Sequence, residues 1–235
     1  MKAMILAAGR GTRMAPLTDH VPKPMIKVAG KPLIEHQVER LVAAGFTDII
    51  INHAYLGEQI EAHLKDGKQL GCRIQYSAES QALETAGGIM QALPLLGDAP
   101  FLVVNGDVWL DFDYRKLNDF KLNGLAHLVL VNNPAFHEQG DFYLCLNENG
   151  PAMVSMDNPN LKNETKFTFS GLSILDPKLF LNYKPGILKL LLPLKDAMKN
   201  KQVSGELYKG YWLDVGTPAR LDSLKSHLEK TVNKS

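Results

Sequence analysis

The sequence has few cysteines and almost no net charge. Cys72 and Cys145 are the only cysteines; they lie far apart without metal-ligand spacing, which argues against a disulfide scaffold and a zinc site. A reducing, cytoplasmic compartment is therefore expected. The 26 Lys and Arg residues nearly balance 25 Asp and Glu residues, giving a formal net charge of +1. No overall field favours nucleic acid or an anionic membrane as a partner, so an anion must be bound by local groups.

Long apolar runs are also absent. The run that starts at Ala3 ends at Gly9, which is too short for a signal peptide, and it is interpreted as a buried first strand. The leucine-rich stretch 187–194 is interrupted by Lys189 and Pro193, whereas a membrane helix needs about 20 consecutive apolar residues. We therefore expect no membrane partner.

Short apolar runs alternate with helical patterns in the first part of the chain. This alternation predicts an α/β fold with a largely parallel sheet covered by helices on both faces. The expected strands are 3–7, 48–52, 73–77 and 101–105, and the expected helices are 33–44, 56–65 and 85–93.

The pattern loosens after Asp107. No internal repeat or low-complexity linker is present, so residues 1–235 are expected to form a single domain. The expected elements are a helix at 113–122, strands at 126–131, 141–146, 167–175 and 203–208, a polar loop at 157–164, a turn at 211–214, and helices at 187–200 and 218–230.

A glycine-rich loop, Gly9-Arg10-Gly11-Thr12-Arg13, follows the first strand. Its glycines let backbone N–H groups approach an anion, and Thr12 and Arg13 add donors. The loop lacks both the Gly-Lys-Ser/Thr ending of a P-loop and the third glycine of a dinucleotide site. If the loop is considered alone, an ordinary turn after a strand explains its sequence nearly as well as a phosphate-binding site does.

Three further residues strengthen a phosphate-binding interpretation. Lys23 stands between two prolines that fix the backbone around it and so aim its ammonium group. Asp107 follows the strand 101–105, at the sheet edge where open α/β folds bind ligands. Asp214 offers a second carboxylate, and the two could share one Mg²⁺ that bridges phosphate oxygens. Either aspartate alone is also typical of a turn or a helix cap.

The joint order of these motifs, which span most of the chain, resembles the sugar-1-phosphate nucleotidyltransferases. The resemblance implies a Rossmann-like three-layer sandwich with a mainly parallel central sheet and a small sugar-binding lobe. Residues 1–110 would mainly bind nucleotide, and residues 111–235 would mainly bind sugar phosphate. By position, Arg13 and Lys23 would be catalytic, and Asp107 and Asp214 would ligate Mg²⁺.

Within this family, stretches such as 83–89 and 105–109 resemble the uridylyltransferases of N-acetylmuramate 1-phosphate, which implies UTP and a sugar 1-phosphate as substrates. The residues implied to bind the nucleotide are Ala8, Gly9, Gly11, Thr12, Arg13, Lys23, Glu79, Leu83, Glu84 and Gly87. Those implied to bind the sugar phosphate are Asn105, Gly140, Asp141, Ser170 and Gly171.

The sequence departs from the wider family at one place. Where hexose-1-phosphate enzymes commonly have Glu-Lys-Pro, this chain has Asp157-Asn158-Pro159. The usual sugar-phosphate lysine is then absent, and Lys189 is the candidate substitute, although a lysine extending from a helix into solvent explains it as well.

Other functions remain open at this point. The chain could also be a glucose-1-phosphate thymidylyl- or uridylyltransferase, or a mannose-1-phosphate guanylyltransferase. These enzymes differ from the uridylyltransferases of N-acetylmuramate 1-phosphate in the base pocket and in the sugar. A nucleotide-sugar sensor without turnover would not need a leaving-group clamp and a two-carboxylate metal site. The sequence shows no diagnostic oligomer interface.

Overall fold

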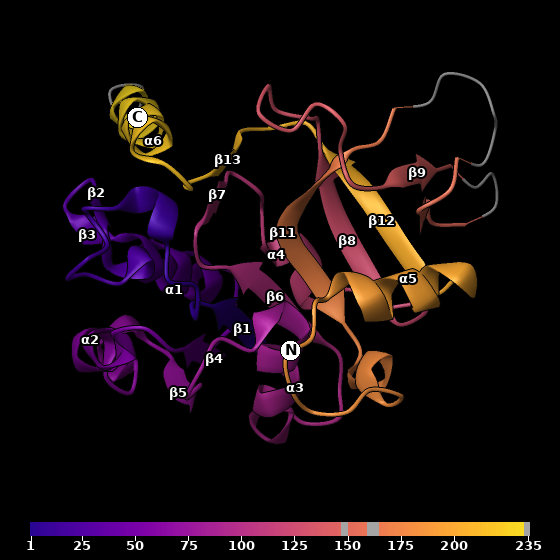
Figure 1. The fold of residues 1–235 in the computed structure, drawn as a ribbon, viewed down its shortest axis with the longest axis horizontal. Coiled ribbons are helices and arrows are strands. Elements are labelled where there is room, and N and C mark those ends of the chain that lie inside the picture. Colours follow the sequence, from indigo (N-terminus) through magenta and orange to yellow (C-terminus); the bar gives the residue numbers. More distant parts are fainter. Residues whose placement is uncertain (147–149, 159–164, 233–235) are drawn as a thin grey trace.

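The computed structural model describes residues 1–146, 150–158 and 165–232, and these form a central nine-stranded sheet in the order β5-β4-β1-β6-β11-β8-β12-β10-β9 (Figure 1). The strands of this sheet are β1 (Ala3–Leu6), β4 (Asp48–His53), β5 (Arg73–Ala78), β6 (Phe101–Asn105), β8 (Ala126–Val131), β9 (Tyr143–Cys145), β10 (Met153–Ser155), β11 (Thr168–Leu175) and β12 (Val203–Tyr208). Two small pairs lie apart from it, β2 (Lys27–Val28) with β3 (Lys31–Pro32), and β7 (Val108–Leu110) with β13 (Trp212–Asp214).

The sheet is mixed. Strands β5, β4, β1 and β6 pair in parallel, because helical crossovers connect them. From β6 onward, β11 pairs antiparallel with both β6 and β8, β12 pairs in parallel with β8, and β10 and β9 form an antiparallel edge. The prediction of an α/β fold is confirmed, with the run of parallel strands concentrated in the first half of the chain.

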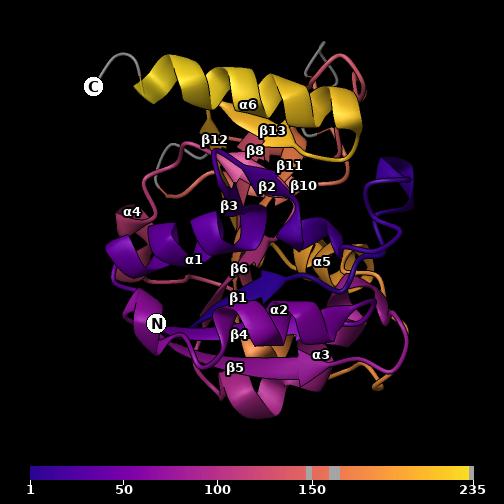
Figure 2. The same cartoon turned by 90° about the vertical axis from the view of Figure 1, so that its left-hand side faces the viewer.

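Helices cover both faces of the sheet. Residues of β1 alternate between the two, since Ala3 and Ile5 pack with α1, α2 and α4, whereas Met4 packs with α3 and α5. The result is the three-layer sandwich that the resemblance implied, with α1 and α2 in front of the sheet in the side view (Figure 2). The helices are α1 (Leu33–Ala43), α2 (Gly57–Leu64), α3 (Glu84–Leu96), α4 (Arg115–Asn118), α5 (Leu191–Lys199) and α6 (Pro218–Val232).

The last helix covers the β7 and β13 pair (Figures 1 and 2). Leu221 and Leu224 of α6 pack with Trp109 of β7 and with Val28 of β2 in a separate apolar cluster. His227 stacks on the Tyr211 ring at a centroid distance of 3.5 Å. None of the helices among the described residues is long and apolar enough to cross a membrane.

Three predictions of local structure are wrong. The expected turn at 211–214 contains β13, because Trp212 to Asp214 pair antiparallel with β7. The expected helix 113–122 shortens to α4, after which Phe120 and Leu122 pack against the core in an irregular segment. The expected helix 187–200 begins only at Leu191, because the backbone of Leu188 instead bonds to Leu83, Ala86 and Gly87 at the start of α3. Most of the expected loop 157–164 lies outside the described residues.

A bulge in β11 fixes the end of its neighbour β6. The register between β11 and β8 shifts between Phe169 and Leu172. The bulge holds Gly171 at φ +86°, and a Cβ there would lie 2.8 Å from Asn105 Nδ2. Only glycine combines this backbone conformation with so close a neighbour. The bulge therefore determines the position of Asn105, the last residue of β6.

This contact predicts a measurable cost for Gly171→Ala. The variant should lose about 2–4 kcal/mol of unfolding free energy, from the left-handed backbone and from the clash with Asn105. Gly30→Ala is the matched control, because Gly30 has φ +83° but open space around the added Cβ. It should lose only about 1 kcal/mol, which is the backbone term alone. Equal losses in urea-induced unfolding would show that the Asn105 contact carries no cost.

Candidate active site

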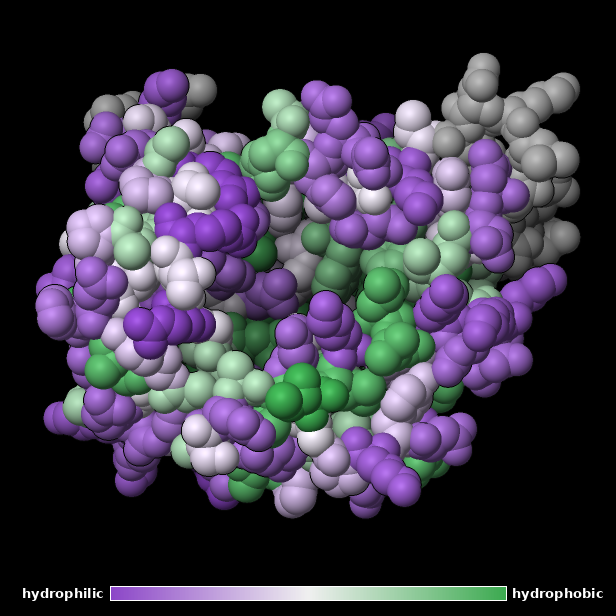
Figure 3. Space-filling model, in the orientation of Figure 1, coloured by the Kyte–Doolittle hydropathy of each residue, from purple (hydrophilic) through white to green (hydrophobic). Residues whose placement is uncertain are grey.

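A cavity of about 520 Å³ lies where β1, β4, β5 and β6 end. Carboxyl ends of parallel strands are the usual ligand-binding edge of an open α/β sheet. Figure 3 shows this face hollowed near its centre, with hydrophilic residues on one side and hydrophobic residues on the other. This cavity is the larger of two that adjoin in the site. Its lining residues are Leu6, Ala7, Ala8, Gly9, Lys23, Pro24, Asn52, Glu79, Ala82, Leu83, Glu84, Thr85, Asn105, Asp107 and Ile187.

Glu79 and Asn52 hold the floor of the larger cavity together. Glu79 is buried, and its Oε1 accepts a hydrogen bond of 2.6 Å from Asn52 Nδ2. Its Oε2 accepts 3.0 Å from the backbone N–H of Leu83, immediately before α3. Asn52 Oδ1 accepts 3.0 Å from the N–H of Ala7. One carboxylate and one amide thus tie together the ends of β1, β4 and β5 and the start of α3.

The glycine loop lies between this floor and solvent. Gly11 has φ +68°, and a Cβ there would lie 2.9 Å from Lys23 Cβ, so the loop packs directly on the lysine stem. The Gly11 carbonyl accepts 2.9 Å from Thr18 Oγ1. Arg10 lies over the Tyr55 ring at 4.4 Å, which anchors the outer side of the loop. Of the loop residues expected to bind nucleotide, Ala8 and Gly9 line the larger cavity, whereas Gly11, Thr12 and Arg13 lie outside its lining.

Lys23 and Asp107 form an ion pair in the larger cavity. Lys23 Nζ lies 2.5 Å from Asp107 Oδ2, with the lysine side chain 7% exposed and the aspartate side chain 36% exposed. A nearly buried ammonium needs a partner, because an uncompensated charge in a low-dielectric site is costly. We expected the flanking prolines to hold Lys23 in a fixed position. In the structure, the ion pair with Asp107 also holds its ammonium group in place.

A smaller cavity of about 340 Å³ adjoins the larger one. The two share Asn105 and Asp107, which therefore stand at the boundary between them. The lining residues of the smaller cavity are Arg13, Asn105, Asp107, Val108, Phe136, His137, Thr168, Phe169, Ser170, Trp212, Asp214 and Arg220.

Strand pairing brings the two predicted metal ligands together. Asp214 of β13 pairs with Val108 of β7, next to Asp107. The N–H of Val215 also donates to the Asp107 carbonyl at 2.8 Å. Asp214 Oδ2 accepts 3.1 Å from Arg220 Nη1, while Asp214 Oδ1 is buried and has no hydrogen-bond partner among the described residues.

The donor set fits a magnesium ion that also binds phosphate. Among the described residues, no three His, Cys, Asp or Glu side chains gather round one point. Mg²⁺ typically takes one or two carboxylates and completes its shell with substrate phosphates and water. Asp107 and the unpartnered Oδ1 of Asp214 match the carboxylate part of that pattern, and substrate phosphates and water would supply the remaining ligands.

Several predicted site residues lie outside both linings. A Cβ on Gly87 would lie 2.2 Å from the Gly186 carbonyl, so its role in the structure is close packing. Gly140 packs against Asn133 and Lys166 in a turn, and Gly171 packs under Asn105. Lys189 is exposed and is not brought to either cavity, contrary to its expected role as the sugar-phosphate lysine.

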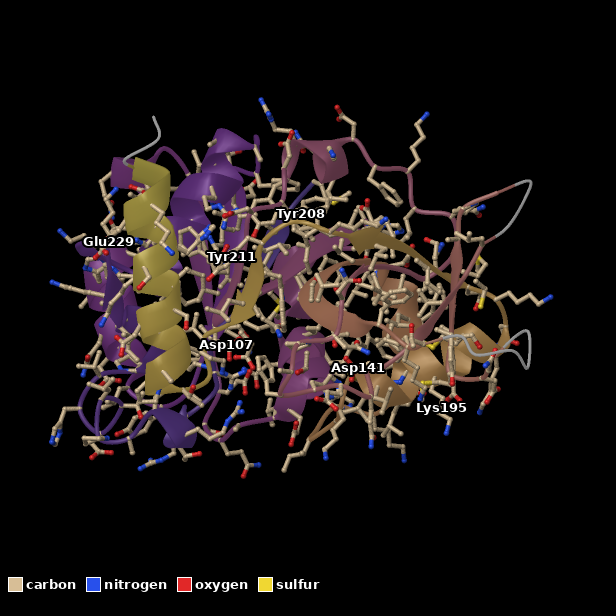
Figure 4. The ribbon with its side chains drawn as sticks, turned by 90° about the horizontal axis from the view of Figure 1, so that it is seen from above. Asp107, Asp141, Lys195, Tyr208, Tyr211 and Glu229 are labelled. Atoms are coloured by element: carbon tan, nitrogen blue, oxygen red, sulfur yellow. The ribbon has the colours of Figure 1, made fainter. Side chains whose placement is uncertain are left out.

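Asp141 acts behind the smaller cavity. Its Oδ1 lies 3.0 Å from His137 Nε2, and its Oδ2 accepts 2.8 Å from the N–H of Phe169. His137 and Phe169 both line the smaller cavity, so Asp141 positions two of its walls. Figure 4 shows Asp141 farther from α6 than Asp107 is. Of the other residues expected here, Ser170 and Asn105 line the cavity directly.

Arg220, Asn52 and Phe136 are among the lining residues of the two cavities that were not predicted from the sequence. Arg220 lines the smaller cavity from the first turn of α6, and its guanidinium carbon lies 4.1 Å from the centre of the Phe136 ring. Asn52 contributes to the floor of the larger cavity. Arg220 follows Asp214 by six residues, and Asp214 lies in β13 and not in a helix, so no helical spacing marks the pair. Asn52 lies in the stretch 51–54, which shares the resemblance to the uridylyltransferases, whereas nothing in the sequence around Phe136 marks it.

Comparison with known proteins identifies the family. Residues 2–231 match the family model described as nucleotidyl transferase. The chain belongs to the nucleotidyltransferase family. It is 50% identical to the N-acetylmuramate alpha-1-phosphate uridylyltransferase of Neisseria meningitidis serogroup B over 94% of this chain and 95% of that protein. It is 34% identical to the enzyme of the same name from Caulobacter vibrioides, over 92% of each chain.

Similarity extends to enzymes with other names. The chain is 33% identical to mannose-1-phosphate guanyltransferase beta-A of Xenopus laevis, over 93% of this chain but 62% of the frog protein. A solved structure of a putative glucose-1-phosphate thymidylyltransferase from Bacillus anthracis has a TM-score of 0.82 at 22% identity, covering 96% of this chain and 94% of that one. These matches confirm the fold and the resemblance to sugar-1-phosphate nucleotidyltransferases, and the protein is an enzyme of that family.

The ion pair between Lys23 and Asp107 predicts a large effect of Lys23→Met on turnover. Removing an electrostatic donor at a phosphoryl-transfer centre should lower kcat by about 10²–10³-fold. Lys31→Met is the matched control, since Lys31 also lies 2.5 Å from a carboxylate, that of Glu39, but on the exposed surface. Pyrophosphate release should be unchanged in this control. If the two variants have equal activity, Lys23 does not take part in the reaction.

Proposed function

We propose that this nucleotidyltransferase transfers UMP from UTP to N-acetylmuramic acid α-1-phosphate, giving UDP-N-acetylmuramic acid and pyrophosphate. The observation that carries the reaction is the meeting of two cavities at Asn105 and Asp107, one beside the glycine loop and one beside Asp214. The choice of sugar and base is supported by the 50% identity to the Neisseria uridylyltransferase along nearly the whole of both chains.

The two cavities suit two phosphorylated substrates. UTP would occupy the larger cavity, with its base near Glu79, Leu83 and Glu84 and its phosphates along Ala8, Gly9 and the loop. The sugar 1-phosphate would occupy the smaller cavity. Residues 1–110 would thus form most of the nucleotide half and residues 111–235 most of the sugar half of one domain.

The chemistry requires positioning and charge neutralisation. An oxygen of the sugar 1-phosphate attacks the α-phosphorus of UTP, and the bond from that phosphorus to the β-phosphate oxygen breaks as pyrophosphate leaves. The attacking oxygen is already anionic and needs no general base. Lys23 would bind phosphate oxygens, and Arg13 would stabilise the charge that develops on the leaving pyrophosphate.

Asp107 and Asp214 are the residues that would hold the metal. Mg²⁺, when bound there, supplies positive charge that neutralises the phosphates and orients them for in-line displacement. In the structure, Lys23 pairs with Asp107 and Arg220 pairs with Asp214. We place the reaction in the cytoplasm, in the recycling of peptidoglycan sugars.

A substrate grid tests the proposed function. UTP, dTTP, GTP and CTP are each combined with the 1-phosphates of N-acetylmuramic acid, N-acetylglucosamine, glucose and mannose, and pyrophosphate release is measured. UTP with N-acetylmuramic acid 1-phosphate should give the highest kcat/KM, and removing Mg²⁺ should abolish release. Preference for GTP with mannose 1-phosphate, or for dTTP with glucose 1-phosphate, would replace this assignment by the corresponding transferase. No release with any pair would leave a nucleotide-sugar sensor.

Arg13→Ala tests the leaving-group role. Loss of one such donor should lower kcat by about 10²–10³-fold. Arg10→Ala is the control within the same loop, since Arg10 stacks on Tyr55 and lines neither cavity. It should keep kcat close to that of the parent enzyme. If Arg13→Ala keeps nearly full turnover in pyrophosphate-release assays, Arg13 does not stabilise the leaving pyrophosphate.

A further inference from the structure

The smaller cavity contains a cation for which the reaction scheme has not yet accounted. Among the described residues, its lining includes two guanidinium groups, Arg13 and Arg220. Arg13 is assigned to the pyrophosphate that leaves from the nucleotide. A sugar 1-phosphate that enters this cavity brings a doubly charged group of its own, which needs a separate partner.

Arg220 is fixed on three sides. Its Nη1 donates 3.1 Å to Asp214 Oδ2, and its Nε lies 3.4 Å from Thr217 Oγ1. The Phe136 ring lies against the guanidinium, and that ring stacks in turn on Trp212 at a centroid distance of 6.4 Å. The arginine side chain is only 13% exposed. Little side-chain entropy is therefore left to lose when a ligand binds.

One end of this guanidinium remains available. Arg220 Nη2 has no hydrogen-bond partner in the described part of the chain, and it faces the space beside Gly216. A Cβ on Gly216 would lie 2.5 Å from Arg220 Nη2, 2.9 Å from Asp214 Oδ1 and 3.1 Å from Arg13 Nη2. The absence of a side chain at Gly216 thus leaves room there for one nitrogen of each guanidinium group and for Asp214 Oδ1. A guanidinium group that is held in place beside a carboxylate expected to take metal is suited to bind a phosphate.

We propose that Arg220 binds the phosphate of the sugar 1-phosphate and supplies the charge that the wider family takes from a lysine, absent here at Asn158. This inference rests on the proposed function and assigns one residue within it. Asp214 and Phe136 hold the guanidinium in place before substrate arrives. The contact with Asp214 places Arg220 at the transferring phosphates, whereas Lys189 lines neither cavity.

Steady-state kinetics of Arg220→Met test the proposal. The KM for N-acetylmuramic acid 1-phosphate should rise by about 10- to 100-fold, the range expected for loss of a charge-assisted hydrogen bond, while the KM for UTP changes little. Arg220→Lys keeps the charge and should recover part of the loss. Phe136→Leu removes the supporting ring at an exposed position and should raise the same KM by about 2- to 5-fold.

Arg115→Met is the matched control, since Arg115 also pairs with an aspartate, Asp113, but is 74% exposed. Its kinetics should match those of the parent enzyme. Thermal melting of each variant checks the fold, and Phe136→Leu tests the site even if Arg220→Met does not fold. A parent enzyme without turnover refutes the proposed function, whereas an active parent with unchanged KM in Arg220→Met and Phe136→Leu refutes only this inference.

Two other outcomes would also overturn it. A rise in KM for Lys189→Met, with none for Arg220→Met, would return the role to Lys189. Unphosphorylated N-acetylmuramic acid is tested as a competitive inhibitor of the parent and of Arg220→Met. If the variant weakens inhibition by N-acetylmuramic acid by the same factor as it raises the KM for the 1-phosphate, the guanidinium of Arg220 binds the lactyl carboxylate of the sugar instead of its phosphate.

Discussion

The pairing of β7 with β13 is the interaction on which the site depends. It joins residues just after β6 to a segment about one hundred positions later and sets Asp214 beside Asp107. Apolar packing of α6 over this pair, with Leu221 and Leu224 at its centre, stabilises the junction. Without it, each cavity would keep most of its lining, but the boundary between them would lack its second carboxylate. The sheet supplies the floor of the site, and this short pair brings its two halves together.

Charge balance organises the groups around that junction. Each carboxylate expected to take metal already faces a cation, Lys23 for Asp107 and Arg220 for Asp214. Such pairing avoids uncompensated charge in a partly buried site. The protein can therefore be nearly neutral overall and still concentrate cations around the two cavities. This explains how a chain with a net charge of +1 serves polyanionic substrates.

The sequence was informative where periodicity or motif order was strong. Strands 126–131 and 203–208 and the first α/β units were predicted within a residue or two, because their apolar patterns match buried elements. β7 and β13 were not, since three-residue strands are defined by long-range pairing and carry no period of their own. In the site, the structure brings Lys23, Asp107 and Asp214 close together, as the motif order led us to expect. Arg220 was not predicted and Lys189 lines neither cavity, because the fold, not local sequence, decides which cation reaches the smaller cavity.

The backbone hydrogen bonds of Leu188 connect the start of α3, which borders the larger cavity, to the segment that precedes α5. α5 in turn contacts β10 and β12, in the half of the sheet away from the glycine loop. Ile187, one residue earlier, lines the larger cavity. The two helices on this face are thus joined by backbone hydrogen bonds, which connect the end of the sheet where the base is expected to the end that carries β10 and β12.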